Sequence, residues 1–167
     1  MPRAKGVRNA DYETKRRELL DRMLPRFVRR DIERPSLRQL AVAAGVTVPT
    51  LEHYFGRRPD VIAALLDEYR RRGENRLQIV SQPNGPFADS MREFAYGMVF
   101  GMKAGGQVRL GDVFAVSLAE GLADPDLAPL ALQYIVDPAI NSLITRLDAH
   151  VAKGEMIETN TRAAALM

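Results

Sequence analysis

A stretch of fourteen residues, GVTVPTLEHYFGRR at positions 45–58, gathers side chains suited to recognising a polar partner. The hydroxyls of Thr47 and Thr50 can hydrogen-bond to the edges of nucleic-acid bases. Val48 and Pro49 offer apolar contacts of the kind made with a thymine methyl group. Two arginines end the stretch, and the planar guanidinium group suits phosphate. The pattern therefore indicates nucleic-acid recognition rather than covalent chemistry.

Catalytic and metal-binding alternatives find little support in the rest of the chain. The sequence has no cysteine, which excludes disulfides, thiolate zinc sites and cysteine nucleophiles. Its two histidines, His53 and His150, fall in different predicted domains, so no metal cluster is expected. The glycine-rich segment GMKAGGQVRLG lacks the Gly-Lys-Ser/Thr of a phosphate-binding loop and follows no predicted strand, so we interpret it as a turn between helices.

A group of carboxylates, Glu120, Asp124 and Asp126, stands near the end of one predicted helix. Carboxylates in such positions are ordinary capping groups, and we interpret these three in that way. We therefore predict that the protein is not an enzyme, with no catalytic residue, no metal and no cofactor.

Charge is distributed unevenly along the 167 residues. Residues 1–76 contain 18 Lys and Arg against 11 Asp and Glu, a balance of +7, whereas residues 77–167 contain 6 against 10, a balance of −4. This asymmetry favours a polyanion as the partner of the first half only, although a solvated charged surface gives the same count. No apolar run reaches the length of a membrane span and the N-terminus has no secretory pattern, so we expect a cytoplasmic protein without a membrane partner.

Helical periodicity of apolar residues recurs throughout, and no segment has the alternation of a strand, so the predicted fold class is all-α. Helices are expected over residues 9–34, 36–44, 47–54, 59–80, 87–102, 108–122 and 125–153, the last interrupted by Pro129 and Pro138. The segment QPNGP at 82–86 is the clearest loop.

Two of these predicted helices, 36–44 and 47–54, form a helix-turn-helix. Ser36 and Gln39 have the spacing of a capping box, and Gly45 is a natural C-terminal stop. Thr47 is positioned to cap the second helix, which would lie in the major groove and present its N-terminal residues to base edges. Beyond it, we expect Phe55 to turn into the core.

The stretch SLRQLAVAAGVTVPTLEHYFGRRPDVIAALLDE resembles the N-terminal domain of tetracycline-repressor-type (TetR) transcriptional regulators, and the resemblance covers about residues 10–80. It implies that the DNA-contacting positions are occupied by Arg38, Val48, Pro49, Thr50, Glu52, Tyr54 and Arg58. With Thr47 and His53, these are the candidate DNA-binding residues. In this family, the residue at position 58 starts the fourth helix and touches phosphate, usually as lysine.

Two positions depart from the family pattern. Glu52 replaces the usual tyrosine and brings a negative charge close to a polyanion, where it could accept a hydrogen bond from a cytosine amine or weaken affinity. Tyr54 replaces the usual histidine, which is displaced to His53, and tyrosine can still donate to a phosphate.

The second half of the chain resembles the family's regulatory domain in outline. Family ligands enter between these helices, which implies that some apolar side chains of 87–153 line a cavity. A stripe of Met and aromatic residues at helical spacing is also typical of an ordinary core. The candidate ligand-binding residues are Met91, Phe94, Met98, Met102, Phe114, Leu118, Tyr134 and Asn141.

Three units are predicted: a helix-turn-helix DNA-binding domain at 1–57, a connecting helix at 58–81, and a helical regulatory domain at 82–167. The last is short at its C-terminus, since Thr161–Met167 would only begin the helices through which family members dimerise. The predicted function is a ligand-responsive transcriptional regulator, a repressor released from operator DNA by a small apolar effector and acting as a homodimer. A helical protein–protein adaptor that binds no DNA is the alternative.

Overall fold

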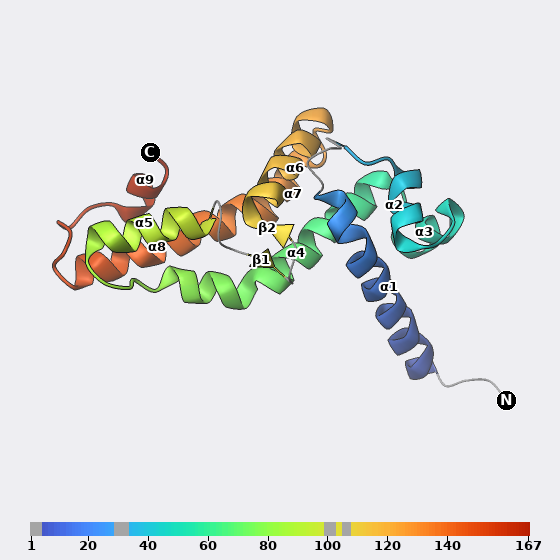
Figure 1. Ribbon diagram of the computed structural model, residues 1–167, viewed down its shortest axis with the longest axis horizontal. Helices are drawn as coiled ribbons and strands as arrows, with labels where there is room; N and C mark the ends of the chain where they lie inside the picture. The colour runs from blue at the N-terminus through green and yellow to red at the C-terminus, as the bar shows by residue number, and fades with distance from the viewer. Residues whose placement is uncertain (1–4, 29–33, 99–102, 105–107) are drawn as a thin grey trace.

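A computed structural model describes residues 5–28, 34–98, 103–104 and 108–167, and its architecture is the predicted all-α one (Figure 1). The helices are α1 (Lys5–Phe27), α2 (Leu37–Ala44), α3 (Val48–Phe55), α4 (Arg58–Ser81), α5 (Phe87–Tyr96), α6 (Leu110–Ala123), α7 (Ala128–Ala131), the π-helical η2 (Leu132–Val136), α8 (Asp137–Ala152) and α9 (Thr161–Ala165). Helices α1, α2 and α3 form a head at one end, and α5, α8 and α9 lie at the other end.

The helix-turn-helix forms where local sequence signals predict it. The Ser36 hydroxyl accepts from the Gln39 amide while the Gln39 side chain accepts from the Ser36 amide, so the predicted capping box is confirmed. Gly45 ends α2 in the left-handed conformation with φ of 71°, and Gly56 turns the chain between α3 and α4 with φ of 91°. The predicted bounds of α2 and α3 are therefore met within one or two residues.

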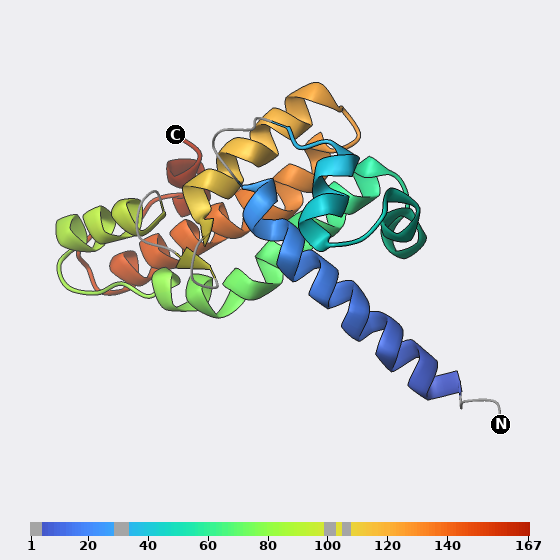
Figure 2. The ribbon, with the colours of Figure 1, turned by 45° about the vertical axis from the view of Figure 1, so that its right-hand side comes forward.

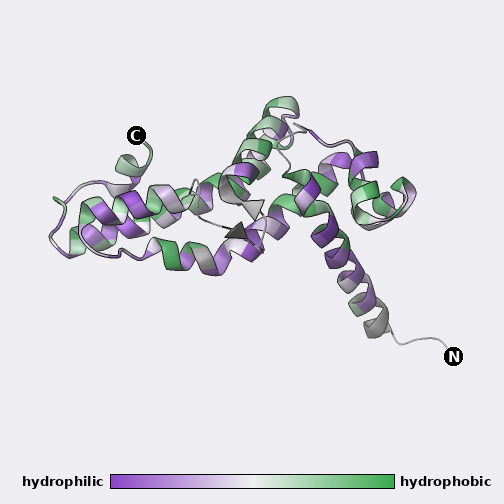
Figure 3. Ribbon diagram, in the orientation of Figure 1, coloured by the Kyte–Doolittle hydropathy of each residue, from purple (hydrophilic) through white to green (hydrophobic). Residues whose placement is uncertain are grey.

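The first helix differs from its prediction at both ends. It begins at Lys5 rather than near residue 9, continues through Pro25 and ends at Phe27 rather than at residue 34. Proline lacks the amide hydrogen that would bond to the preceding turn, which weakens the helix close to this end. In both views the N-terminal part of α1 projects away from the body (Figure 2), and much of this projecting part is hydrophilic (Figure 3).

Helix α4 is the central element, since it belongs to the core of the head and its C-terminal half runs beside α8. One hydrophobic cluster includes buried residues of α1, α2 and α3 and of the first half of α4. The same cluster contains Val113, Leu127 and Ile135, which belong to the second half of the chain. Arg72 joins α4 to Asp21 of α1 and to Glu68, and partial burial lowers the pKa of its guanidinium below the ordinary value. The head and the following helices therefore share one continuous core.

The segment between α5 and α6 contains the only strands among the described residues. Strands β1 (Lys103–Ala104) and β2 (Val108–Arg109) pair antiparallel, with Lys103 opposite Arg109 and Ala104 opposite Val108. The sequence predicted only a turn here, and a ladder of two residues is too short to give an alternating pattern. Helix α5 ends at Tyr96, earlier than predicted.

Residues 128–152 run as helix without a break, although they contain two prolines. Pro129 lies in the first turn of α7, where its missing amide hydrogen costs nothing. Ahead of Pro138, the chain adopts the wider π-helical η2 before α8 resumes normal geometry. A π-turn changes the hydrogen-bond ladder locally, which lets the helix continue past a residue that cannot donate.

Among the described residues, no helix combines the length and apolar character needed to cross a membrane.

Candidate nucleic-acid interface

Helix α3 presents one polar face to solvent and one apolar face to the head. Thr47, Pro49, Glu52 and His53 are exposed, whereas Leu51 is fully buried in the core. Four of the nine candidate residues therefore share a continuous exposed surface at the tip of the head. The C-terminal flank of this surface carries the exposed Arg57, and Arg38 of α2 is exposed as well.

The two threonines at the start of α3 are bonded to each other. Their hydroxyl oxygens are 2.8 Å apart, and the Thr47 hydroxyl also accepts from the Thr50 amide at 3.3 Å. Thr47 is thus the predicted N-cap of α3. One hydroxyl hydrogen serves the pair and the other stays available, so together the two residues can donate one hydrogen bond outward.

Val48 and Tyr54 are less accessible than Pro49, Glu52 and His53. Val48 packs against the hydrophobic core, and Tyr54 is half-buried against α1. The ring of Tyr12 stacks on Tyr54 with centroids 4.9 Å apart, and the Tyr12 hydroxyl donates to the Tyr54 carbonyl at 3.2 Å. Tyr12 is not among the candidate DNA-binding residues, yet it fixes the end of α3 against α1.

Two arginines of α1 also brace the helix-turn-helix. Arg22 donates to the carbonyl of Ala44 at the end of α2, at 3.3 Å. Arg16 lies over the ring of Phe55, with Cζ 4.9 Å from its centroid. Phe55 is half-buried and packs against the core, which agrees with its predicted inward orientation.

Arg58 begins α4 as the family resemblance implies, and its guanidinium is bound inside the protein. Nη1 and Nη2 donate to the two carboxylate oxygens of Glu120 at 2.9 and 2.5 Å, and Nε donates to the Pro35 carbonyl at 3.1 Å. Arg34 also contacts this carboxylate, with its Nε 3.3 Å from Oε2 of Glu120. A phosphate contact by Arg58 would therefore compete with a carboxylate of α6.

Glu120 is the functional side chain that sequence reasoning interpreted wrongly. Its side chain is fully buried, so it is not a solvent-facing capping group. Asp124 does cap locally, since its carboxylate accepts from the Asp126 amide at 3.1 Å. The arginine partners of Glu120 lie 62 and 86 residues away in sequence, and no local pattern could have paired them.

Four of the candidate ligand-binding residues line three separate clefts in the part of the chain that the structure describes. Phe114 and Leu118 line an apolar cleft of about 100 Å³ between α6 and the α7–η2 segment. Tyr134 lines a small cleft of about 20 Å³ between α4 and η2, and Asn141 lines another between α4 and α8. Met91, Phe94 and Met98 line none of these three, and Met102 lies outside the described residues.

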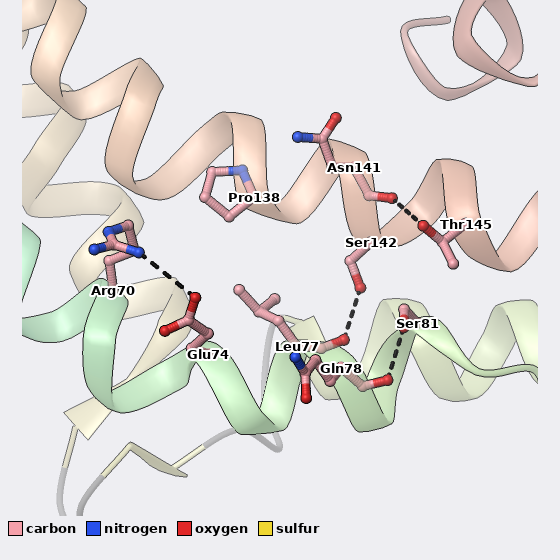
Figure 4. A pocket seen from close by; sticks show the side chains of 9 residues that line it. All are labelled: Arg70, Glu74, Leu77, Gln78, Ser81, Pro138, Asn141, Ser142 and Thr145. Atoms are coloured by element: carbon pink, nitrogen blue, oxygen red, sulfur yellow. Dashed lines mark hydrogen bonds and ion pairs between the residues drawn. The ribbon is translucent and has the colours of Figure 1, made fainter.

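The cleft between α4 and α8 has a volume of about 350 Å³, and most of the residues that line it are polar (Figure 4). From α4 it is lined by Arg70, Glu74, Leu77, Gln78 and Ser81, and from α8 by Pro138, Asn141, Ser142 and Thr145. The Ser142 hydroxyl donates to the Leu77 carbonyl at 3.2 Å and joins the two walls. Of the candidate ligand-binding residues, Asn141 lies on its walls.

A buried serine of α5 and a buried histidine of α8 stand in line with an exposed glutamate that follows α8. His150 Nε2 is 2.8 Å from the Ser90 hydroxyl, and Nδ1 is 2.5 Å from a Glu155 carboxylate oxygen. The order resembles that of a catalytic triad. Ser90 and His150 are both fully buried, with the Phe87 ring edge-on to the imidazole, so no substrate can reach the hydroxyl. Within the described chain, moreover, no three metal-ligating side chains come together.

Comparison with known proteins supports the fold. No protein-family model matches the chain, and no curated protein matches it. Among solved structures, the fold is similar to that of a Mesorhizobium loti MAFF303099 protein named "putative TetR-family transcriptional regulator", with a TM-score of 0.68 and 13% identity. The match covers 93% of this chain and 77% of that chain.

Proposed function

We propose that this protein is a DNA-binding transcriptional regulator of the TetR type. The observation that carries the proposal is the capped α2–turn–α3 unit, whose second helix exposes Thr47, Pro49, Glu52 and His53 on one face. A helix presented in this way fits the major groove, and the exposed Arg38 and Arg57 are available for phosphates beside it. The similarity in fold to a protein named as a TetR-family regulator supports the same function.

In this proposal the protein is a repressor that acts as a homodimer in the cytoplasm. Occlusion of a promoter requires only tight operator binding, whereas activation requires a polymerase contact that no feature of the chain suggests. One head covers a single half-site, and a single module buries too little surface for typical operator affinity, so two copies on a palindrome-like site are proposed.

The proposed effector acts through the helices that follow the head. Phe114 and Leu118 line the apolar cleft against one side of α6, and Glu120 of the same helix holds Arg58 at the start of α4. A ligand that favours one position of α6 therefore alters the carboxylate that holds a proposed phosphate-binding residue. A ligand changes the DNA-binding equilibrium only through its difference in affinity for the two states.

The test of DNA binding is selection of bound fragments from a random double-stranded pool by the full chain. We expect enrichment of a two-fold related sequence, and an affinity that falls linearly with the logarithm of salt concentration. Arg57→Gln should reduce the slope of that line by about one, because one phosphate contact is lost. Arg92→Gln is the matched control, since Arg92 is exposed on α5 at the other end of the molecule.

The adaptor alternative predicts a different result in the same experiment. A helical adaptor would retain no DNA at low salt, and neither arginine substitution would change its behaviour. Failure to retain any fragment at low salt would overturn the proposed function.

A further inference from the structure

The carboxylate of Glu120 joins helix α6 to both flanks of the helix-turn-helix. Arg34 lies two residues before Ser36, the N-cap of α2, and Arg58 begins α4 after the turn that follows α3. Both carboxylate oxygens accept from Arg58, at 2.9 and 2.5 Å, and Oε2 also accepts from Arg34 at 3.3 Å. One carboxylate therefore ties the segments before α2 and after α3 to the same point on α6.

The three side chains of this cluster differ in their access to solvent. The side chain of Glu120 is fully buried, whereas that of Arg58 is 22% exposed and that of Arg34 is 40% exposed. A buried carboxylate without a cation beside it is costly, so Glu120 cannot lose both partners at once. Because Arg34 is already in contact with Glu120, Arg58 can leave without stranding an unpaired buried charge.

Arg58 cannot serve this carboxylate and a DNA phosphate at the same time. Each of its three guanidinium nitrogens donates within the protein, two to Glu120 and the third to the Pro35 carbonyl. Guanidinium groups bind carboxylate and phosphate through the same planar set of donors. A phosphate contact by Arg58 therefore requires the ion pair to break, and the pair lowers the affinity for DNA by what that costs. The exposed Arg57 beside it is not among the partners of Glu120 in the described chain.

We propose that Glu120 withholds Arg58 from DNA, and that Arg34 takes over the carboxylate when Arg58 transfers to a phosphate. Glu120 is then an internal competitor of the DNA backbone, and Arg34 is a positioning residue that lowers the cost of the exchange. The inference rests on the proposed function, since it concerns the same DNA-binding surface. It differs from a role as a structural clamp, because loss of a clamp weakens DNA binding and loss of a competitor strengthens it.

The test compares affinities of the full chain for a short DNA duplex of random sequence at several salt concentrations, because a phosphate contact carries no sequence information. Glu120→Gln should bind this duplex about tenfold more tightly than the wild type, as expected when charged hydrogen bonds that compete with the phosphate are weakened. The gain should disappear in the Arg58→Gln background and persist in full in the Arg57→Gln background. These two backgrounds separate the release of Arg58 from the general effect of removing a negative charge.

The role of Arg34 is tested in the same assay. Arg34→Gln should weaken binding of the duplex while Glu120 is present, because Arg58 is then the remaining arginine beside the buried carboxylate. In the Glu120→Gln background, the same substitution should change neither the affinity nor its salt dependence. A salt slope lowered by about one in that background would make Arg34 a direct phosphate contact and reject the exchange.

Circular dichroism of each variant checks that it is folded. Glu120→Asp replaces Glu120→Gln if the latter does not fold, since the shorter side chain cannot hold both guanidinium groups and should also strengthen binding. Equal or weaker binding by the folded variant, or an equal gain in the Arg58→Gln background, would overturn the inference and leave the proposed function standing. Failure of the wild type and every variant to bind the duplex at low salt would reject both.

Discussion

Arg58 lies beside the head at the start of α4, whereas Arg146 lies on α8 toward the other end of the molecule. The two guanidinium groups differ in how completely they are hydrogen-bonded. The three guanidinium nitrogens of Arg58 all donate, two of them to both oxygens of the buried Glu120. Arg146 is more deeply buried, yet only one of its nitrogens is engaged. The comparison teaches that burial alone does not ensure pairing: the guanidinium of Arg58 is fully hydrogen-bonded within the protein, whereas two buried nitrogens of Arg146 have no acceptor among the described residues.

The largest expected effect comes from breaking the ion pair between Arg58 and Glu120. Glu120→Gln should lower the free energy of unfolding by about 3–5 kcal/mol, because it leaves two arginines facing a buried neutral amide. Urea unfolding followed by circular dichroism measures the change. Asp126→Asn, an exposed carboxylate on the neighbouring loop, is the control and should change stability by less than about 0.5 kcal/mol. A small effect at Glu120 would mean that the pair contributes little and that the two ends are alike.

The next largest effect concerns the recognition of DNA by the head and leaves the α5–α8 end unaffected. Thr50→Ala should change the preference among DNA sequences by about 1–3 kcal/mol per lost base contact, with little change in the salt dependence. Competition between selected fragments measures this preference. Thr145→Ala, the same substitution at the α4–α8 cleft, should leave it unchanged. Equal loss of affinity for every sequence would assign Thr50 to phosphate instead.

A smaller effect tests whether the head depends on its local caps. Ser36→Ala removes the acceptor for the Gln39 amide and should cost about 1 kcal/mol of stability. Ser36→Asp keeps an acceptor and should restore most of the loss in thermal unfolding. If both variants were as stable as the wild type, tertiary packing rather than the capping box would hold α2.

The smallest effect is expected at Arg146, the arginine with two buried nitrogens that lack an acceptor among the described residues. Arg146→Met should change the stability of the ligand-free chain by less than about 1 kcal/mol or increase it, because an apolar side chain of similar length removes a poorly paired buried charge. Urea unfolding beside Glu120→Gln gives the direct contrast. A loss as large as that of Glu120→Gln would show that Arg146 is paired as completely as Arg58.

Sequence reasoning succeeded where the signal is local. The capping box at Ser36, the turn at Gly45 and the cap at Thr47 each depend on residues within a few positions, and all three form as predicted. The Arg58–Glu120 pair depends on the packing of α6 beside the start of α4, which no short window contains. The candidate ligand residues shared helical stripes, but a stripe does not say which neighbour it faces, and four of them line three separate clefts among the described residues.

The unbroken helix α4 has a consequence for distance. Its 24 residues span about 36 Å at 1.5 Å per residue, which is close to the ~34 Å that separates adjacent half-sites on one side of DNA. A tilt of about 10° at the Ser81 end would displace the Arg58 end by about 6 Å, as follows from the same helix length. A local adjustment at the α4–α8 cleft, too slight to disturb the core, would thus become a mismatch of about two base pairs' rise between the paired heads and the DNA.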